Sequence, residues 1–347
     1  MKTMIRHLLT VLLGALALVG LNSCEHKDLC YHHDHTVTLN LLFDWRDAPE
    51  AEVQGMCVFF YPLDEGLQTR RFDFEDNRGG EINIKAGRYE VVCYNNDTEE
   101  VRARNAHDLS LHELYTRDAD LFEPVGASAP SRVPRAPEAE EESVAACPEE
   151  MWGCCANDVE VEPQGISYVC IPETEKDPWL GENMHTRTEN TITLYPHVLT
   201  CVYTYEIRNV KNLEYVQSAS ASLSGMSRSL FVSTEELHRD RVTLPFGATV
   251  NRDNNTITGR FITFGHHEEN PQPHRMMLYV WATDGNRYAF GTKGEHMNVT
   301  DQVHAAPDRR RVHLVIDGLE MPSPISGSEG FEPSADEWSE VETDIFM

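Results

Sequence analysis

Cys24 is the residue whose surroundings most clearly indicate a chemical modification. Lys2 and Arg6 give the chain a short basic head, and an apolar run over residues 8–21 leads into Leu21-Asn22-Ser23-Cys24. This is the pattern of a secretory signal that is cut just before a cysteine, whose thiol then forms a thioether to diacylglycerol. The apolar run is shorter than the roughly 20 residues that a permanent membrane-spanning helix needs. The sequence therefore predicts a lipoprotein signal peptide and lipid, including palmitate-type acyl chains, on Cys24; an ordinary cleaved signal peptide is the alternative.

The chain has nine cysteines, so eight remain if Cys24 carries lipid. An even number suits disulfide formation in an oxidising compartment. Cys57 and Cys93 lie in apolar, strand-like runs, where a buried free thiol is as good an interpretation as a bridge. Bridging is favoured for a later cluster: Cys147, Cys154, Cys155 and Cys170. Eight cysteines allow about 105 complete pairings, so the connectivity stays open.

Two strings of histidines and acidic residues contain side chains that could bind a metal ion. They are Tyr31-His32-His33-Asp34-His35 and His266-His267-Glu268-Glu269. Neighbouring residues of an extended chain point in different directions, so each string would need a further ligand from elsewhere in the fold. The cysteines also lack the paired spacing typical of zinc sites. We therefore predict that both strings are solvated or packed loops and that the chain has no metal site.

The sequence has no pattern typical of an enzyme. Ser224-Gly225-Met226-Ser227 lacks the glycine-flanked serine turn of hydrolases, and no phosphate-binding loop or dinucleotide fingerprint occurs. Removal of residues 1–23, which contain two basic and no acidic residues, changes the net charge from −28 to −30. Such an acidic surface repels nucleic acid. We predict a non-enzymatic protein with no catalytic residue, no cofactor, no nucleotide and no nucleic-acid partner.

Short apolar or alternating runs separated by turn residues indicate an all-β chain. Typical strands are residues 36–43, 87–94 and 276–283, and Asp284-Gly285-Asn286 is a tight hairpin turn after the last of them. Their spacing of about ten residues is typical of β-sandwiches. The one longer helical pattern covers 108–117, with Asp108 as its cap.

A segment rich in proline, glutamate and cysteine divides the strands into two groups. Pro124, Pro130, Pro134 and Pro137 precede an acidic run at 138–142, a composition typical of a solvated linker with little that packs. The predicted organisation is a signal peptide (1–23), an N-terminal tether (24–35), a first sandwich domain (36–123), a linker (124–184), a second sandwich domain (185–320) and an acidic C-terminal tail (321–347).

Several strings together resemble a family of surface lipoproteins from anaerobic gut and oral Gram-negative bacteria. They are the segment from Cys24 to Tyr31, Phe43-Asp44-Trp45, Ala48-Pro49, Gly55-Met56, Phe60-Tyr61-Pro62, Tyr89 to Thr98, and the tail from Gly330-Phe331 to Trp338. The family is similar to the fimbrillin-associated anchor lipoproteins. The resemblance implies two transthyretin-like β-sandwiches in tandem and no catalytic residues.

The resemblance also implies a function in fimbrial anchorage or assembly at the outer membrane. Fimbrillin-like subunits are the expected partners, because an exposed sheet edge can pair with a strand of another subunit. Phe331, Trp338 and Phe346 in the tail are the candidate contacts, with a strand that completes the second domain as the alternative. The acidic Glu25 and Asp28, just after the lipid site, favour exposure at the cell surface.

The alternative function is a glycan-binding lipoprotein of a polysaccharide-uptake system. Aromatic side chains with polar neighbours can serve as sugar platforms, and the candidates are Trp45, Trp179 and Trp281, together with the polar run at 94–99. Such Asn- and Asp-rich runs are more often turns whose side chains bond to the backbone.

Overall fold

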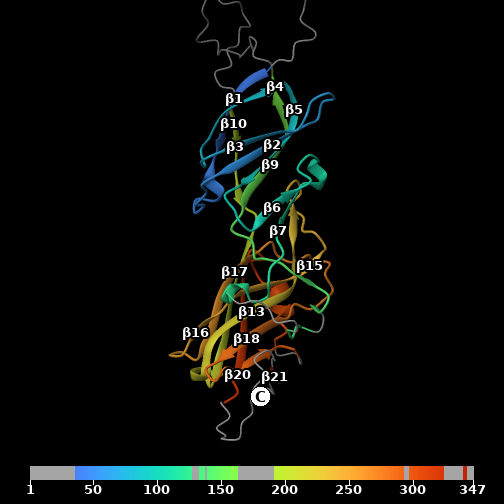
Figure 1. Cartoon of the computed structure of the whole chain (residues 1–347). Coiled ribbons are helices and arrows are strands. Elements are labelled where there is room, and N and C mark those ends of the chain that lie inside the picture. Colours follow the sequence, from blue (N-terminus) through green and yellow to red (C-terminus); the bar gives the residue numbers. More distant parts are fainter. Residues whose placement is uncertain are drawn as a thin grey trace, which may run out of the picture.

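The computed structural model describes residues 36–126, 133–136, 139–162, 191–292, 297–323 and 339–341. Figure 1 shows an elongated body in which strands from the first part of the chain form one end and strands from the last part form the other. Strands make up nearly all of the regular secondary structure in the described chain, which confirms the predicted all-β class. Its helices are short, and none of those described has the length and apolar character that a membrane crossing needs.

The first sandwich contains two sheets that pack around one apolar core. Alternation explains β1, whose side chains are exposed and buried in turn and whose buried members, Val37, Leu39, Leu41 and Phe43, all enter this core. One sheet has the order β10-β1-β4 and the other β11-β9-β5-β2-β3. The strands are β1 (Thr36–Phe43), β2 (Met56–Pro62), β3 (Arg70–Phe74), β4 (Gly79–Lys85), β5 (Gly87–Asn95), β9 (Trp152–Val161), β10 (Thr191–Leu194) and β11 (His197–Val198).

The second sandwich has the larger core, again built by two facing sheets. Their orders are β16-β17-β12-β20 and β21-β19-β18-β13-β15-β8. The strands are β8 (Ser143–Val144), β12 (Cys201–Lys211), β13 (Val216–Ser227), β15 (Arg241–Gly247), β16 (Thr249–Asn251), β17 (Thr256–Thr263), β18 (Met276–Ala282), β19 (Arg287–Phe290), β20 (Arg311–Glu320) and β21 (Ser339–Val341). The predicted turn at 284–286 joins β18 to β19, which pair antiparallel.

A small third sheet joins the sandwiches, with the order β14-β7-β6. Its strands are β6 (Val101–Arg104), β7 (Glu113–Thr116) and β14 (Ser229–Phe231). β14 follows the long β13 of the second sandwich, so this sheet unites both halves of the chain. The core beneath it explains the unbroken apolar sequence of β2: Val58 faces the first core, whereas Phe59 faces this junction core.

The helix expected at 108–117 does not form. Asp108 caps only a 3-10 turn (Leu109–Leu111), accepting a hydrogen bond from the Ser110 N–H, and the chain then enters β7. Pairing of β7 with both β6 and β14 outweighs the local helical pattern. The other short elements are 3-10 turns at Trp45–Asp47, Glu123–Val125 and Leu213–Tyr215, and the helix α2 (Thr300–His304).

The strand pairing does not follow the domain boundaries expected from the sequence. β9 lies within the expected linker yet pairs with β5 inside the first sandwich. β10 and β11 lie in the expected second domain, but they pair with β1 and β9 of the first sandwich. Figure 1 shows β10 beside β1. The chain therefore enters the second sandwich at β8, returns to the first for β9 to β11, and enters the second again at β12. Local composition cannot predict such a path.

The proline-rich segment, expected to pack poorly, covers a face of the second sandwich. Ala136 and Ala139 of this segment, together with Leu121 and Phe122 just before it, are buried against side chains of β18 and β19. β8 pairs with β15 in the same region.

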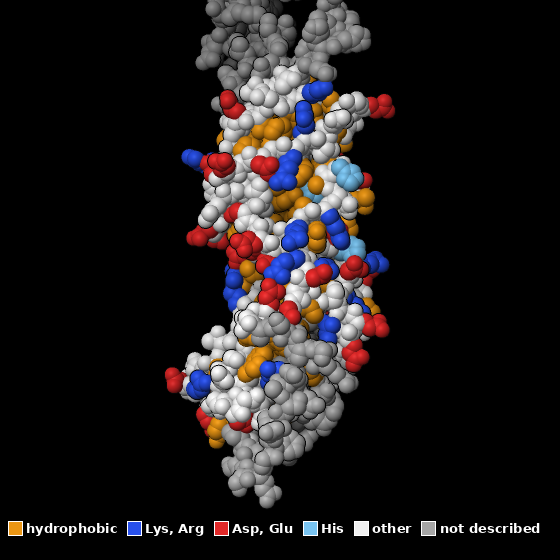
Figure 2. Space-filling model, in the orientation of Figure 1, with side chains coloured by type: hydrophobic (Ala, Val, Ile, Leu, Met, Phe, Trp, Pro, Cys, Tyr) orange, Lys and Arg blue, Asp and Glu red, His pale blue; other side chains and the backbone are white. Residues whose placement is uncertain are grey.

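Around the middle of the body, Figure 2 shows charged side chains of both signs gathered together. Ion pairs that join distant parts of the chain include Arg228–Asp118 and Arg260–Glu150.

Candidate functional site

The residues predicted to carry function lie outside the described part of the chain. These are the lipidation site Cys24 and the candidate contacts Phe331, Trp338 and Phe346. The structure describes the segments next to them, β1 after Cys24 and β21 within the tail. β1 begins twelve residues after Cys24, so a fully extended tether would span at most about 40 Å. The lipid site and the tail contacts therefore remain predictions. The positions of β1 and β21 indicate at which end of the molecule each of them would lie.

β21 is the described part of the tail, and it forms an edge strand of the second sandwich. It pairs in parallel with β19 through Tyr288 and Ser339, Ala289 and Glu340, and Phe290 and Val341. Val341 also packs against the second core. Without this three-residue strand, the outer edge of β19 would expose unpaired N–H and C=O groups. An edge covered by so short a segment is the place where a strand of another chain could pair.

The two ends of the described chain lie at opposite ends of the molecule. Figure 1 shows β1 in the sandwich at one end and β20 and β21 in the sandwich at the other. A membrane attachment that precedes β1 would thus leave the β19–β21 edge pointing away from the membrane.

The proposed sugar platforms are engaged in contacts within the protein. The Trp45 indole N–H donates a 2.7 Å hydrogen bond to the Asn77 carbonyl, and the ring packs on the first core. The Trp281 ring contacts the Phe122 ring edge-on, with 5.2 Å between ring centroids. Trp179 lies outside the described residues. These contacts leave neither described ring as a free, flat platform.

The polar run at 94–99 bonds mainly to backbone, as expected for a turn. The Asn95 side chain accepts from the Trp152 N–H, and the Asp97 carboxylate accepts from the Gln54 N–H. The Thr98 hydroxyl donates to the Val101 carbonyl. These groups organise the junction between strands and are not displayed for a ligand.

A cleft of about 820 Å³ opens beside the junction of the sandwiches. Its lining includes Leu199, Leu230, Glu235, Phe264, His266 and Arg310. Glu235 accepts from His197 of β11 across 2.6 Å and pairs with Arg310, which lies just before β20, across 3.3 Å. The hydrogen bond to Glu235 raises the pKa of His197, and the same bond lowers the pKa of the Glu235 carboxyl. This carboxylate therefore ties the first sandwich to the second.

Replacement of His197 by glutamine is expected to lower the free energy of unfolding near pH 6 by at most about 1 kcal/mol, because the pair is partly solvated. The pKa of His197 is raised on folding, so its contribution is complete below the unfolded pKa and is lost as pH rises through the folded pKa. Urea titrations at pH 6 and pH 9 should therefore show a difference from wild type only at the lower pH. An equal difference at both values would contradict an ionic role. His313→Gln, at an exposed position on β20, is the control.

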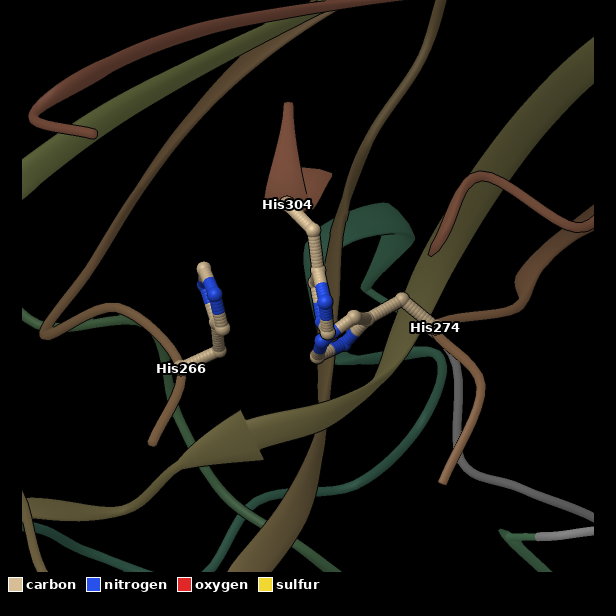
Figure 3. A group of neighbouring side chains, drawn as sticks. All are labelled: His266, His274 and His304. Atoms are coloured by element: carbon tan, nitrogen blue, oxygen red, sulfur yellow. The ribbon is translucent and has the colours of Figure 1, made fainter. Parts of the chain in front are cut away.

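Three histidines that are far apart in the sequence meet in the second sandwich. His266 follows β17, His274 precedes β18 and His304 ends α2, and one nitrogen of each lies within 4.8 Å of the others. Figure 3 shows the three rings facing a common space. The sequence drew attention to the string that begins at His266 but not to its partners, since only the packing of α2 brings His304 to the other two. The other string of that kind, at 31–35, lies outside the described residues.

The described cysteines are free thiols, and two of them are neighbours. Cys93 and Cys154 face each other across β5 and β9, with 3.4 Å between their sulfur atoms. Cys57, Cys147, Cys155 and Cys201 are also free. The bridging expected in the cluster at 147–170 therefore does not form at Cys147, Cys154 or Cys155. Cys30 and Cys170 lie outside the described residues.

Comparison with known proteins gives a family and a fold. The family model described as "Domain of unknown function (DUF5119)" matches residues 23–247. A Bacteroides ovatus protein, provisionally named fimbrium anchoring subunit Fim4B, is 33% identical over 108 residues. That match covers 30% of this chain and 31% of the relative, so the chain spans about a third of the relative's length. It confirms the resemblance to fimbria-associated surface proteins that the sequence indicated.

The comparison with solved structures gives matches at low sequence identity. A crystal structure of a Bacteroides ovatus protein, provisionally named an adhesin, has a TM-score of 0.56 at 17% identity and covers 87% of this chain and 99% of that one. The fimbrial anchor protein Mfa2 from Porphyromonas gingivalis has a TM-score of 0.43 at 14% identity, covering 81% of this chain and 90% of that one. The first of these shows that the all-β arrangement along most of the chain is shared.

Proposed function

The chain belongs to the DUF5119 family, and we propose that it is a non-enzymatic, lipid-anchored protein of the outer membrane that fixes a fimbria to the cell surface. The observation that carries the proposal is the match to a relative named as a fimbrium anchoring subunit. The lipoprotein signal before Cys24 supplies the membrane attachment. Several acyl chains, each contributing roughly 0.8 kcal/mol per buried methylene, would make that attachment lasting.

The arrangement of the molecule supports an anchor in particular. Lipid on Cys24 would hold the end of the body that contains β1, and the β19–β21 edge lies at the other end. A fimbrillin-like subunit would dock there by adding a strand to β19, in place of β21 or beside it. Main-chain hydrogen bonds would then provide affinity, and the alternating side chains would provide specificity. In this proposal the two sandwich domains are a spacer between membrane and fibre.

Strand pairing at this edge can be tested with a chain that ends at residue 323, which removes β21 and the candidate contacts Phe331, Trp338 and Phe346. The lipid site is unchanged, so the shortened protein should stay in the membrane fraction. We expect it to co-isolate fimbrial subunits differently from wild type: more if β21 blocks the edge, less if the tail makes the contact. Unchanged co-isolation, with a folded protein confirmed by circular dichroism, would contradict a role of this edge.

The glycan-binding alternative predicts a different result. Calorimetric titration with oligosaccharides should give sugar-specific heat that Trp45→Ala and Trp281→Ala abolish. We expect no such heat, because both rings are packed against other groups of the protein. Tight binding of one sugar by the wild-type chain would favour the alternative.

A further inference from the structure

We propose that His266, His274 and His304 form a binding site for a divalent transition-metal ion of the zinc type. Imidazole nitrogen is a ligand that suits such ions, and the three nitrogens already lie within 4.8 Å of one another. The proposal is independent of fimbrial anchorage, since it rests on side chains within the second sandwich (Figure 3).

His274 is the central ligand because it is fully buried and its free nitrogen has no partner. Its Nδ1–H donates to the Ser224 carbonyl across 3.1 Å, which places the lone pair on Nε2. Nε2 is buried and has no hydrogen-bond partner among the described residues. A buried acceptor without a partner is destabilising, and a metal ion would satisfy it. A carbonyl that fixes the tautomer of a histidine is the usual outer-shell arrangement of metal sites.

A β-bulge provides that carbonyl. The register of β13 against β15 shifts between Leu223 and Met226, and Gly225 within the shift has a φ of +78°. A Cβ at Gly225 would lie 2.8 Å from Nδ1 of His274, so a side chain there would displace the ring. Bulges often re-aim groups beside functional sites, and this one directs the Ser224 carbonyl at His274.

α2 brings His304 to the site and is itself held on both sides. The backbone N–H of His274 donates to the Thr300 hydroxyl oxygen across 2.8 Å, which ties the start of α2 to the central ligand. The Gln302 side chain makes two hydrogen bonds to the backbone of Val315 in β20, and Val303 is buried. His304 itself is exposed, so its side chain is free to turn toward an ion.

His266 completes the group from the loop after β17. Gly265, the preceding residue, accepts from the Ser227 N–H across 2.8 Å and fixes this part of the loop. The His266 ring lies nearly parallel to the His304 ring, 4.9 Å between centroids. Burial, with the nearby His274 and His304, lowers the pKa of His266 to about 4, and burial lowers that of His274 to about 4.

The donor set favours zinc-like ions over calcium or magnesium, which prefer oxygen ligands. Zn–N bonds of about 2.0–2.1 Å would bring tetrahedral nitrogens to about 3.4 Å, a modest approach from the observed spacing. Three protein ligands leave a fourth position, and His266 lines the cleft from which water could fill it. Arg309 is one of the cations close to His266, and the Glu268 carboxylate pairs with it.

Cobalt(II) titration of the mature full-length chain, after chelator treatment, tests the site. We expect one equivalent to give the visible absorption of tetrahedral Co²⁺ with nitrogen ligands, without a thiolate charge-transfer band, and Zn²⁺ to displace it. His304→Gln removes an exposed ligand and should leave the fold intact, which circular dichroism checks. It should weaken binding at least about tenfold. His313→Gln, an exposed histidine outside the group, should bind as wild type.

Three results would overturn the proposal: no cobalt bound, a thiolate band that shows binding at cysteines, or equal affinities for wild type and His304→Gln. His274→Gln provides a second measurement in which the central ligand is lost. Zn²⁺ should raise the Tm of the wild-type chain but not that of this variant, and an equal rise in both would also contradict the site.

Discussion

Phe122→Ala is expected to lower the free energy of unfolding by about 3 kcal/mol, the range typical of a large buried side chain cut back to alanine. Phe122 is 1% exposed. Its ring meets those of Tyr279 and Trp281 edge-on, with centroids 5.1 Å and 5.2 Å away. Truncation would open a cavity where the proline-rich segment covers the second sandwich. Urea unfolding followed by fluorescence measures the change, and cleavage by trypsin after Arg135 should become faster.

Leu111→Ala is the matched control for this experiment, because Leu111 is 49% exposed. Its effect should stay within about 0.5 kcal/mol. If Phe122→Ala behaved like this control, the packing of Phe122 against β18 described above would be wrong, and the segment that follows it could be the solvated linker predicted for 124–184.

Acidification should destabilise the junction core through His112. His112 is 0% exposed, and its two nitrogens lie 2.6 Å and 3.0 Å from the hydroxyl oxygens of Tyr61 and Tyr94. Burial lowers the pKa of His112 to about 4, below its ordinary value near 6.5. The unfolded chain therefore takes up the proton first, so the contribution to stability is complete above about pH 6.5 and is lost as pH falls. We expect a loss of about 3 kcal/mol by pH 4.

Comparison with His112→Gln isolates this contribution from that of other groups. The glutamine variant should be less stable at pH 7 yet lose about 2–3 kcal/mol less than wild type between pH 7 and pH 4.5. His313→Gln, at an exposed position on β20, is the control for the replacement of a histidine by glutamine. Parallel pH profiles for wild type and His112→Gln would show that His112 is not held neutral by burial.

The sequence predicted those elements whose form depends on the residues of one short segment. The alternation in β1 and the Asp284-Gly285-Asn286 turn both appear in the structure as expected, because period-two burial and tight turns are properties of short segments. β9 was not predicted as a strand, because its sequence from Trp152 mixes glycine, cysteines and polar residues. Its extended conformation is stabilised by its pairing with β5. The return of β10 to β1 depends on the path of the whole chain, which no local pattern contains.

The candidate sites also differ in how far a short stretch of sequence can predict them. The signal before Cys24 is a linear motif, so the sequence can predict it in full. The histidine group is not linear: His274 and His304 meet because Thr300 bonds to the His274 backbone and α2 packs on β20. Recognition of such a site requires the tertiary contacts. Trp281 illustrates the reverse error, since its exposure was assumed from sequence and Phe122 lies against it.

We propose that lipid on Cys24 holds a fimbria to the cell. The test uses cells whose own copy of the gene is deleted and replaced by wild type or by Cys24→Ala, with Cys57→Ala as the matched cysteine control. We expect palmitate label in the wild-type and Cys57→Ala proteins but not in Cys24→Ala, whose cells should release fimbriae into the medium. Cys24→Ala protein that remains in the outer membrane, on cells that keep their fimbriae, would show that lipid on Cys24 is not what holds the fimbria.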